Sequence, residues 1–170
     1  MKRVLAGIAA GLAASWIMNQ FQSAIKPKQE QNPAGKPDEQ GGQHVKHHRQ
    51  PTVEVADRVM NTVAGRHLRP EEEKVAGPLV HYAYGAAIGG LYAYAADRNP
   101  KITAAAGLPF GVAVWLLADE VPLPLLGLSK PPWEYPASMH AYALASHAVY
   151  GMAVEGVRRG LCHLSENQVI

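Results

Sequence analysis

Long apolar stretches alternate with polar segments along the chain. The apolar stretches cover residues 4–21, 78–96, 102–118 and 137–157, and none of them contains lysine or arginine. A helix needs about 20 mostly apolar residues to cross the hydrocarbon core of a bilayer. The pattern therefore predicts an all-α fold, a polytopic membrane protein built as a bundle of four transmembrane helices.

A polar segment separates the first predicted span, within residues 1–22, from the second. This segment covers residues 23–76, and its first half is rich in Lys, Gln, Gly, Pro and His, a composition typical of a flexible loop. Within residues 52–68, Val55 and Val59 fall on one helical face. That spacing predicts an amphipathic helix lying on the membrane surface. The alternative is an ordinary helix packed against a partner protein.

The remainder of the chain, residues 77–170, is predicted to hold three spans. The last two spans are separated by residues 121–136, a segment that contains five prolines yet stays apolar. Prolines at this density do not allow a regular helix. We therefore expect this segment to lie along the membrane interface, with Trp133 and Tyr135 at the level of the lipid headgroups.

Two other interpretations compete with the membrane bundle. A water-soluble helical protein could contain four apolar helices, but helices that are apolar on all sides need a larger protein around them. Residues 1–21 also resemble a cleaved signal peptide, because Lys2 and Arg3 precede an apolar run. No A-x-A motif follows that run, which favours an uncleaved first span.

Glycines recur at a spacing of four residues in the first three predicted spans. The pairs are Gly7 and Gly11, Gly85 and Gly89, and Gly107 and Gly111. Small residues at this spacing allow two helix backbones to approach closely in lipid, so we expect these glycines to mediate helix packing. The alternative is that glycine and alanine are merely abundant in this chain.

The net charge and the cysteine content exclude two features, a nucleic-acid partner and an intrachain disulfide. The formal net charge of +2 is too small to indicate a nucleic-acid partner, and Cys162 is the single cysteine, which excludes an intrachain disulfide. The predicted partners are the lipid bilayer and either a second copy of the chain or a membrane complex. Basic residues predict that both termini are cytoplasmic, because one side of the predicted bundle collects Lys2, Arg3, Arg98, Lys101, Arg158 and Arg159.

Up-and-down threading brings the polar residues of the spans into one leaflet of the membrane. These candidate site residues are Asn19, His81, Asp119, Glu120, His140 and His147. His147 follows His140 by two helical turns, which places it on the same face about 10 Å further along the helix. Ionisable residues inside a membrane usually face the interior of a bundle or a watery cavity.

Three roles are open for this cluster of histidines and carboxylates. The cluster can join the helices by hydrogen bonds, relay protons, or bind a metal ion or haem. The chain lacks HExxH and paired CxxC motifs, so metal binding stays open and no cofactor is predicted. The leading hypothesis is a non-enzymatic membrane protein, without catalytic residues, connected with envelope or acid stress. The alternatives are a metal- or haem-binding redox subunit and a structural subunit of a larger membrane complex.

Several motifs resemble one known family. They are ADE at the end of the third span, PLLGLS followed by prolines, HYAYGAAIGG in the second span, and a last span with two histidines and VYG. Together they resemble the YagU-like family of small bacterial inner-membrane proteins, over most of the chain outside residues 23–68. The resemblance implies a polytopic bacterial membrane protein without an established catalytic activity. Its recurring motif corresponds to Asp119, Glu120, Pro122, His140 and His147.

Overall fold

The computed structural model describes residues 2–25, 50–127 and 131–167, and this part of the chain is helical throughout, with no β-strand. The described residues form six α-helices, one of which continues into a π-turn, and two short 3-10 segments. The elements are α1 (Lys2–Ile25), α2 (Pro51–Ala64), α3 (Pro70–Arg98), η1 (Pro100–Gly107), α4 (Leu108–Val114), η2 (Trp115–Glu120), α5 (Pro122–Leu125), η3 (Pro132–Glu134) and α6 (Ala137–Asn167). The predicted all-α class is confirmed, whereas most of the predicted polar loop lies outside the described residues.

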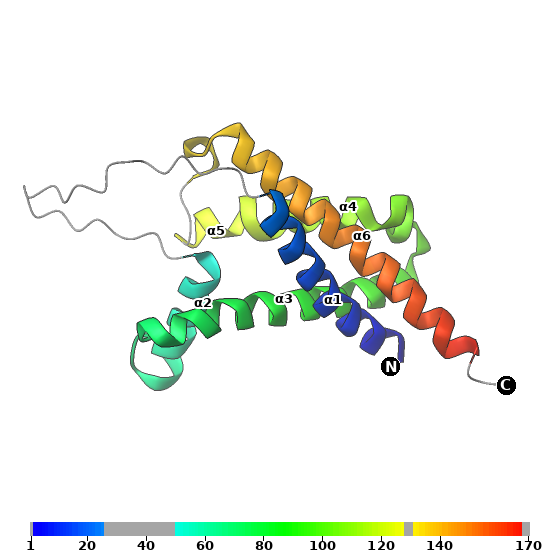
Figure 1. Cartoon of the computed structure of the whole chain (residues 1–170), viewed down its shortest axis with the longest axis horizontal. Helices are drawn as coiled ribbons and strands as arrows, with labels where there is room; N and C mark the ends of the chain where they lie inside the picture. Colours follow the sequence, from blue (N-terminus) through cyan, green and yellow to red (C-terminus); the bar gives the residue numbers. More distant parts are fainter. Residues whose placement is uncertain (1, 26–49, 128–130, 168–170) are drawn as a thin grey trace, which may run out of the picture.

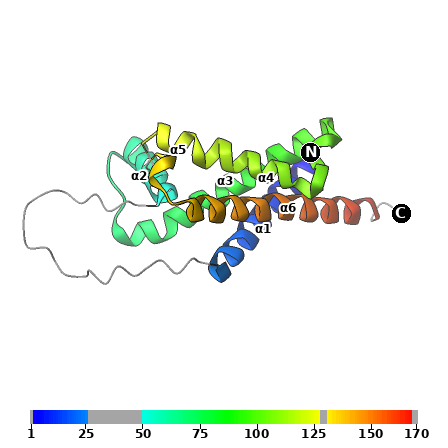
Figure 2. The same cartoon turned by 90° about the horizontal axis from the view of Figure 1, so that it is seen from above.

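Helix α1 crosses α3 and α6, while α4 runs beside α6 (Figure 1). At 29 and 31 residues, α3 and α6 are the longest elements. At 1.5 Å per residue they extend about 44 and 46 Å, which exceeds the roughly 30 Å of a bilayer core. Helices α2 and α5 lie together at the end of the molecule where α6 begins (Figure 2).

Helices α1 and α3 touch through backbone atoms, because glycines occupy their crossing. A Cβ atom added to Gly89 would lie 2.7 Å from the Cα of Gly11, and one added to Gly7 would lie 2.5 Å from the carbonyl oxygen of Gly89. Gly85 likewise packs against the main chain of Gly11 and the side chain of Ser15. Any larger residue at these positions has to separate the two helices.

A second glycine contact joins α4 to α6. A Cβ atom on Gly151 would lie 2.5 Å from the carbonyl oxygen of Gly107 and 2.8 Å from the Cα of Gly111. Gly111 in turn packs against the main chain of His147. The glycines of the third predicted span therefore pair with Gly151 in the fourth, so the two glycine contacts fix two separate helix pairs.

The predicted third span, residues 102–118, is not one continuous α-helix. Backbone angles leave the helical region at Ala104, and Ala105 and Ala106 have positive φ values of 47° and 55°. The α-helix restarts after Gly107, which has a φ of 84°, with Pro109 in its first turn. Proline has no N–H to donate but fits the first turn of a helix, so the chain ends one helical segment and begins another here.

Helix α2 is attached to the start of α3 by polar contacts. The buried Asp57 accepts hydrogen bonds from the backbone N–H of Leu68 at 2.7 Å and pairs with Nδ1 of His67 at 2.8 Å. Beyond this turn, Glu72 accepts from the backbone N–H of Arg69 at 2.9 Å. Hydrogen bonds from Arg66 lower the pKa of Glu72 well below its usual value, which keeps this cap of α3 ionised.

Large apolar side chains face outward over much of the bundle. Leu117, Leu125 and Trp133 are exposed by 72%, 80% and 83%. The interior holds smaller or polar residues instead; buried members of the core include Ala10, Ala14, Met18, Tyr92, Tyr150 and Val154. Among the described helices, the segments Arg3–Ile25 and Pro100–Leu125 are long and apolar enough to cross a membrane.

We predict that alanine at the crossing glycines destabilises the bundle, whereas alanine at exposed glycines does not. Gly89→Ala and Gly111→Ala should each lower the free energy of unfolding by about 1–3 kcal/mol, because the added Cβ overlaps neighbouring backbone. Gly156→Ala and Gly160→Ala are matched controls, since nothing lies within 4 Å of either position. These controls should be neutral or stabilising by up to about 1 kcal/mol. Equal melting temperatures for all four purified variants would contradict the close packing.

We also predict that Asp57 holds α2 in place. Asp57→Ala should lower the free energy of unfolding by about 1–3 kcal/mol and speed proteolysis between α2 and α3, because the buried N–H of Leu68 loses its acceptor. The control is Glu54→Ala, which removes only the exposed pair with Arg58 and should change stability by less than about 1 kcal/mol. Equal proteolysis rates in the two variants would show that Asp57 does not attach α2.

Candidate functional site

A π-helical turn carries the two adjacent carboxylates Asp119 and Glu120. The backbone N–H of Val121 reaches back five residues to the carbonyl oxygen of Leu116 at 3.2 Å. Pro122 comes two residues after Glu120. Its nitrogen has no hydrogen to donate to a carbonyl of the preceding turn, and its ring clashes with that turn in a regular α-helix. Such wide turns are frequent at functional sites, and this one turns both carboxylates toward α6.

Each carboxylate of the π-turn pairs with one histidine of α6. Nε2 of His147 lies 3.3 Å from Oδ2 of Asp119, and Nδ1 of His140 lies 2.7 Å from Oε1 of Glu120. The two histidines are seven residues apart on one face of the helix. The predicted cluster is therefore divided into two pairs, each joining the same two elements.

The second ring nitrogen of each histidine faces a backbone carbonyl. Nδ1 of His147 lies 2.8 Å from the carbonyl oxygen of Ala143, and Nε2 of His140 lies 2.9 Å from that of Pro132. A carbonyl oxygen only accepts hydrogen bonds, so that nitrogen carries a proton. The remaining nitrogen then faces a carboxylate, and a hydrogen bond forms there only if a further proton is held by the imidazole or by the acid.

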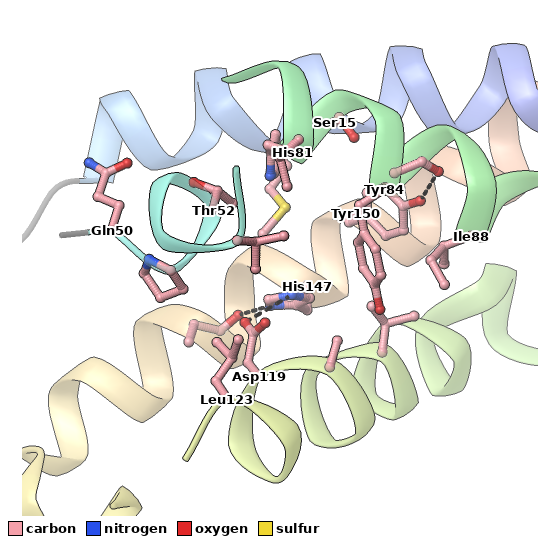
Figure 3. A pocket seen from close by; sticks show the side chains of 18 of the residues that line it. Ser15, Gln50, Thr52, His81, Tyr84, Ile88, Asp119, Leu123, His147 and Tyr150 are labelled. Atoms are coloured by element: carbon pink, nitrogen blue, oxygen red, sulfur yellow. Dashed lines mark hydrogen bonds and ion pairs between the residues drawn. The ribbon is translucent and has the colours of Figure 1, made fainter. Parts of the chain in front are cut away.

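A cavity of about 760 Å³ adjoins the Asp119–His147 pair and is drawn in Figure 3. His81 and Tyr84 reach it from α3, and Tyr150 reaches it from α6. Helix α2 contributes Gln50, Pro51, Thr52 and Val55 to the wall, while Asn19 and Gln22 come from the end of α1. Glu120 and His140 do not line this cavity, so the predicted residues do not all converge on one space.

The remaining predicted polar residues lie where α1 meets α3. Nδ2 of Asn19 donates to the hydroxyl of Tyr82 at 3.2 Å. Oγ of Ser15 and Nε2 of His81 are buried without a hydrogen-bond partner among the described residues, as is Nε1 of Trp115. Buried polar atoms are nearly always satisfied, so these three atoms are exceptions among the described residues, and Ser15 and His81 belong to the cavity wall.

Sequence reasoning missed three of the side chains around this cavity. Ser15, Tyr84 and Tyr150 line it, and the Tyr150 hydroxyl donates to the carbonyl oxygen of Gly85 at 2.7 Å. A signal for the tyrosines exists, because Tyr84 follows His81 by three residues and Tyr150 follows His147 by three. Residues at that spacing share a helix face.

A second polar cluster lies at the opposite end of the bundle. The buried Glu155 accepts hydrogen bonds from Arg158, at 2.8 and 3.0 Å, and from Arg159, and it also accepts one from the Tyr92 hydroxyl at 3.0 Å. Pairing of Glu155 with the two arginines is expected from their spacing and is confirmed. The contact with Tyr92 joins α3 to α6 and was not predictable from helical spacing.

The described residues contain no group of three or more His, Cys, Asp and Glu side chains arranged to hold a metal ion. Each histidine–carboxylate pair offers only two side-chain ligands, and the carbonyl contacts occupy the other imidazole nitrogens. The arrangement instead suits the binding and release of protons, because each pair combines an imidazole with an acid.

Comparison with known proteins adds one match. A family model described as a protein of unknown function, DUF1440, matches residues 43–156, which is more than half of the chain. The matched range includes both histidine–carboxylate pairs and ends one residue after Glu155. No curated protein and no solved structure matches the chain.

Proposed function

The chain belongs to the DUF1440 family of proteins of unknown function, and from this premise we propose that it is a small integral membrane protein that binds protons on its two histidine–carboxylate pairs. The single observation that carries this proposal is the paired geometry at the π-turn. In each pair one imidazole nitrogen donates to a carbonyl while the other faces an acid.

The distribution of apolar side chains supports a membrane location. A water-soluble bundle of this size gains most of its stability by burying large apolar residues. Here Leu117, Leu125 and Trp133 point outward, while small residues and polar groups fill much of the interior. This inverted arrangement suits a lipid environment, in which small residues allow close helix packing. We propose that α1, α3, the segment Pro100–Leu125 and α6 form the four transmembrane segments.

We further propose the bacterial inner membrane, with both termini in the cytoplasm, in keeping with the YagU-like resemblance. An ion pair of 3.2 Å between Arg3 and Asp97 supports a shared end for the start of α1 and the end of α3. Arg158 and Arg159 belong to the cluster at that end, and basic residues favour the cytoplasmic side. The cavity and the two carboxylates of the π-turn then face the periplasm, whose acidity follows that of the surroundings.

Proton binding follows from the hydrogen-bond requirements of each pair. Without an extra proton, an imidazole lone pair and an ionised carboxylate face each other, and both are acceptors. One proton between them converts this repulsive contact into a charge-assisted hydrogen bond. The contact between His140 and Glu120, at 2.7 Å, has the length of such a bond. Loading or emptying the two pairs would alter how the π-turn packs against α6, which is a means of responding to acid stress.

The two alternative functions have less support. A redox subunit needs ligands for a metal or haem, and within the described residues no suitable group of side chains occurs. A structural subunit that bound its partners through its glycine faces would need those faces to be exposed. Gly7, Gly11, Gly85, Gly89, Gly107 and Gly111 all contact other parts of the same chain, so those faces are already occupied.

We predict that the two ends of the bundle lie on opposite sides of the membrane. Cys162 near the end of α6 should react with a membrane-impermeant maleimide only after the cells are permeabilised. In a Cys162→Ser background, Glu71→Cys at the exposed start of α3 should react in spheroplasts without permeabilisation. Release of the protein from membranes by alkaline carbonate, as a detergent-free monomer, would refute the membrane location.

We predict that His140 and His147 share protons with their carboxylates. In ¹⁵N NMR spectra of histidine-labelled protein in micelles at neutral pH, Nδ1 of His140 should carry or share a proton. In Glu120→Gln it should become a plain acceptor, because the glutamine amide donates to it. Asp119→Asn should change Nε2 of His147 in the same way. His163, on the exposed last turns of α6, is the internal control and should not change.

The cellular test of the same proposal uses both substitutions together. Bacteria that carry Asp119→Asn and Glu120→Gln should survive acid exposure less well than bacteria with the wild-type protein at equal membrane levels. Unchanged NMR signals in the single variants would contradict proton sharing. Unchanged survival, together with altered signals, would show that proton binding does not serve acid resistance.

A further inference from the structure

The described wall of the cavity carries an acidic side chain but no lysine or arginine. That side chain is Asp119, the only carboxylate in the described lining. Most other lining residues are apolar, and three are tyrosines, namely Tyr84, Tyr142 and Tyr150. A volume of about 760 Å³ falls in the usual range of small-molecule pockets, which is about 300–1,000 Å³. Apolar walls, aromatic rings and one acid are together suited to an organic cation.

Asp119 is positioned to act as the anionic contact. Its side chain is 39% exposed, although it lies between helices, because it borders the cavity. Oδ2 faces His147, and no hydrogen bond to Oδ1 is found among the described residues. Glu120, its neighbour in the π-turn, instead hydrogen-bonds to His140 away from the cavity. The π-turn therefore presents one acid to the cavity and one to the α6 contact.

The Ser15 side chain belongs to the α1–α3 side of the cavity wall. The Ser15 residue is 1% exposed and lines the cavity, yet its Oγ has no hydrogen-bond partner in the described chain. Serine in an apolar helix usually satisfies its hydroxyl on a backbone carbonyl of the preceding turn. In Figure 3, Ser15 and His81 lie on the α1–α3 side of the cavity, opposite Asp119. The Ser15 hydroxyl packs against Gly85 and has almost no accessible surface, so polar contacts for a ligand held by Asp119 come from other lining residues, among them Asn19 and Thr52.

We propose that this cavity binds an organic cation with a bulky apolar body, whose charge rests on Asp119 in competition with the proton shared by Asp119 and His147. The inference rests on the proposed membrane location and adds a ligand class to the same site. A cation stabilises the ionised acid and needs a neutral imidazole beside it. Entry of the cation therefore releases the shared proton, and charge within the cavity stays balanced.

Other titratable groups around Asp119 are consistent with this exchange. Helix α3 brings His81 and Tyr84 near the carboxylate, and α6 brings His147 and Tyr150. Helices α1 and α2 contribute only uncharged residues to the cavity wall, including Asn19, Ser15 and Thr52. Glu120 is the nearest other acid, but its own pair with His140 holds it outside the cavity. The exchange of one cation for one proton is thus centred on a single carboxylate.

The test uses two probes of matched shape and opposite charge. Tetraphenylphosphonium carries a permanent positive charge, and tetraphenylborate carries a negative one. Equilibrium dialysis of the full-length protein in neutral detergent should give saturable binding of about one tetraphenylphosphonium per chain and no saturable binding of tetraphenylborate. Because the probe does not titrate, its affinity should fall by up to about tenfold for each unit decrease in pH. An indicator dye should detect proton release as the cation binds.

Substitutions then locate the charge contact. Asp119→Asn should weaken tetraphenylphosphonium binding by about tenfold or more, because the cation loses its counter-charge in a cavity of low polarity. Asp119→Glu keeps the charge and should retain measurable binding. Asp97→Asn is the control, since it removes a carboxylate from the opposite end of the bundle and should leave the affinity unchanged. Circular dichroism and gel filtration of each variant establish that it is folded.

Several results would overturn the proposal. They are the absence of saturable tetraphenylphosphonium binding, equal binding of the two probes, and undiminished binding by folded Asp119→Asn. Affinity that does not depend on pH would refute the competition with a proton. Membrane location and proton sharing are measured separately, by maleimide labelling and by the histidine NMR signals. A failure of cation binding is therefore distinguishable from a failure of the proposed function.

Discussion

Direct backbone contact between helices is the constraint on which the rest of the structure depends. Glycines remove the side chains at the α1–α3 and α4–α6 crossings, so each pair is held by backbone packing. Van der Waals attraction falls steeply with separation, so close backbone approach strengthens the attraction between these helices. The packing distance set by Gly111 and Gly151 also determines how near α6 comes to the π-turn. A wider α4–α6 crossing would move His147 away from Asp119.

A cavity follows from the same geometry. Where glycines bring helices together at one level, the tilted helices separate toward their ends, and α2 with its neighbouring segments covers the opening. Polar side chains from α3, η2 and α6 line that space, namely His81, Asp119 and His147. The pair of Asp119 and His147 lies beside this space, and the pair of Glu120 and His140 lies outside it. Their position depends on Pro122, which interrupts the regular helix and leaves the preceding turn wide.

The sequence predicted the features that are determined within a single helix. The apolar stretches indicated helices, and helical spacing placed His140 and His147 on one face. It could not foresee the break at Ala104, Ala105 and Ala106, because alanine strongly favours a helix and only the tertiary fold holds it elsewhere. Nor could it assign partners, since the choice of His147 for Asp119 depends on the register between α6 and the π-turn. Ser15 was missed for the same reason, because its position at the cavity depends on how α1 and α3 cross.

The two acids of the π-turn have different surroundings, and this difference argues for different roles. Glu120 hydrogen-bonds to a histidine whose other nitrogen is held by Pro132, so its pair joins three chain segments and is shielded from the cavity. Asp119 has a longer contact with its histidine and borders the cavity. A short, shielded pair stabilises the packing of helices, whereas a looser pair beside a cavity can exchange its proton for another cation. Our proposals therefore assign the helix-joining role to Glu120 and the ligand-binding role to Asp119.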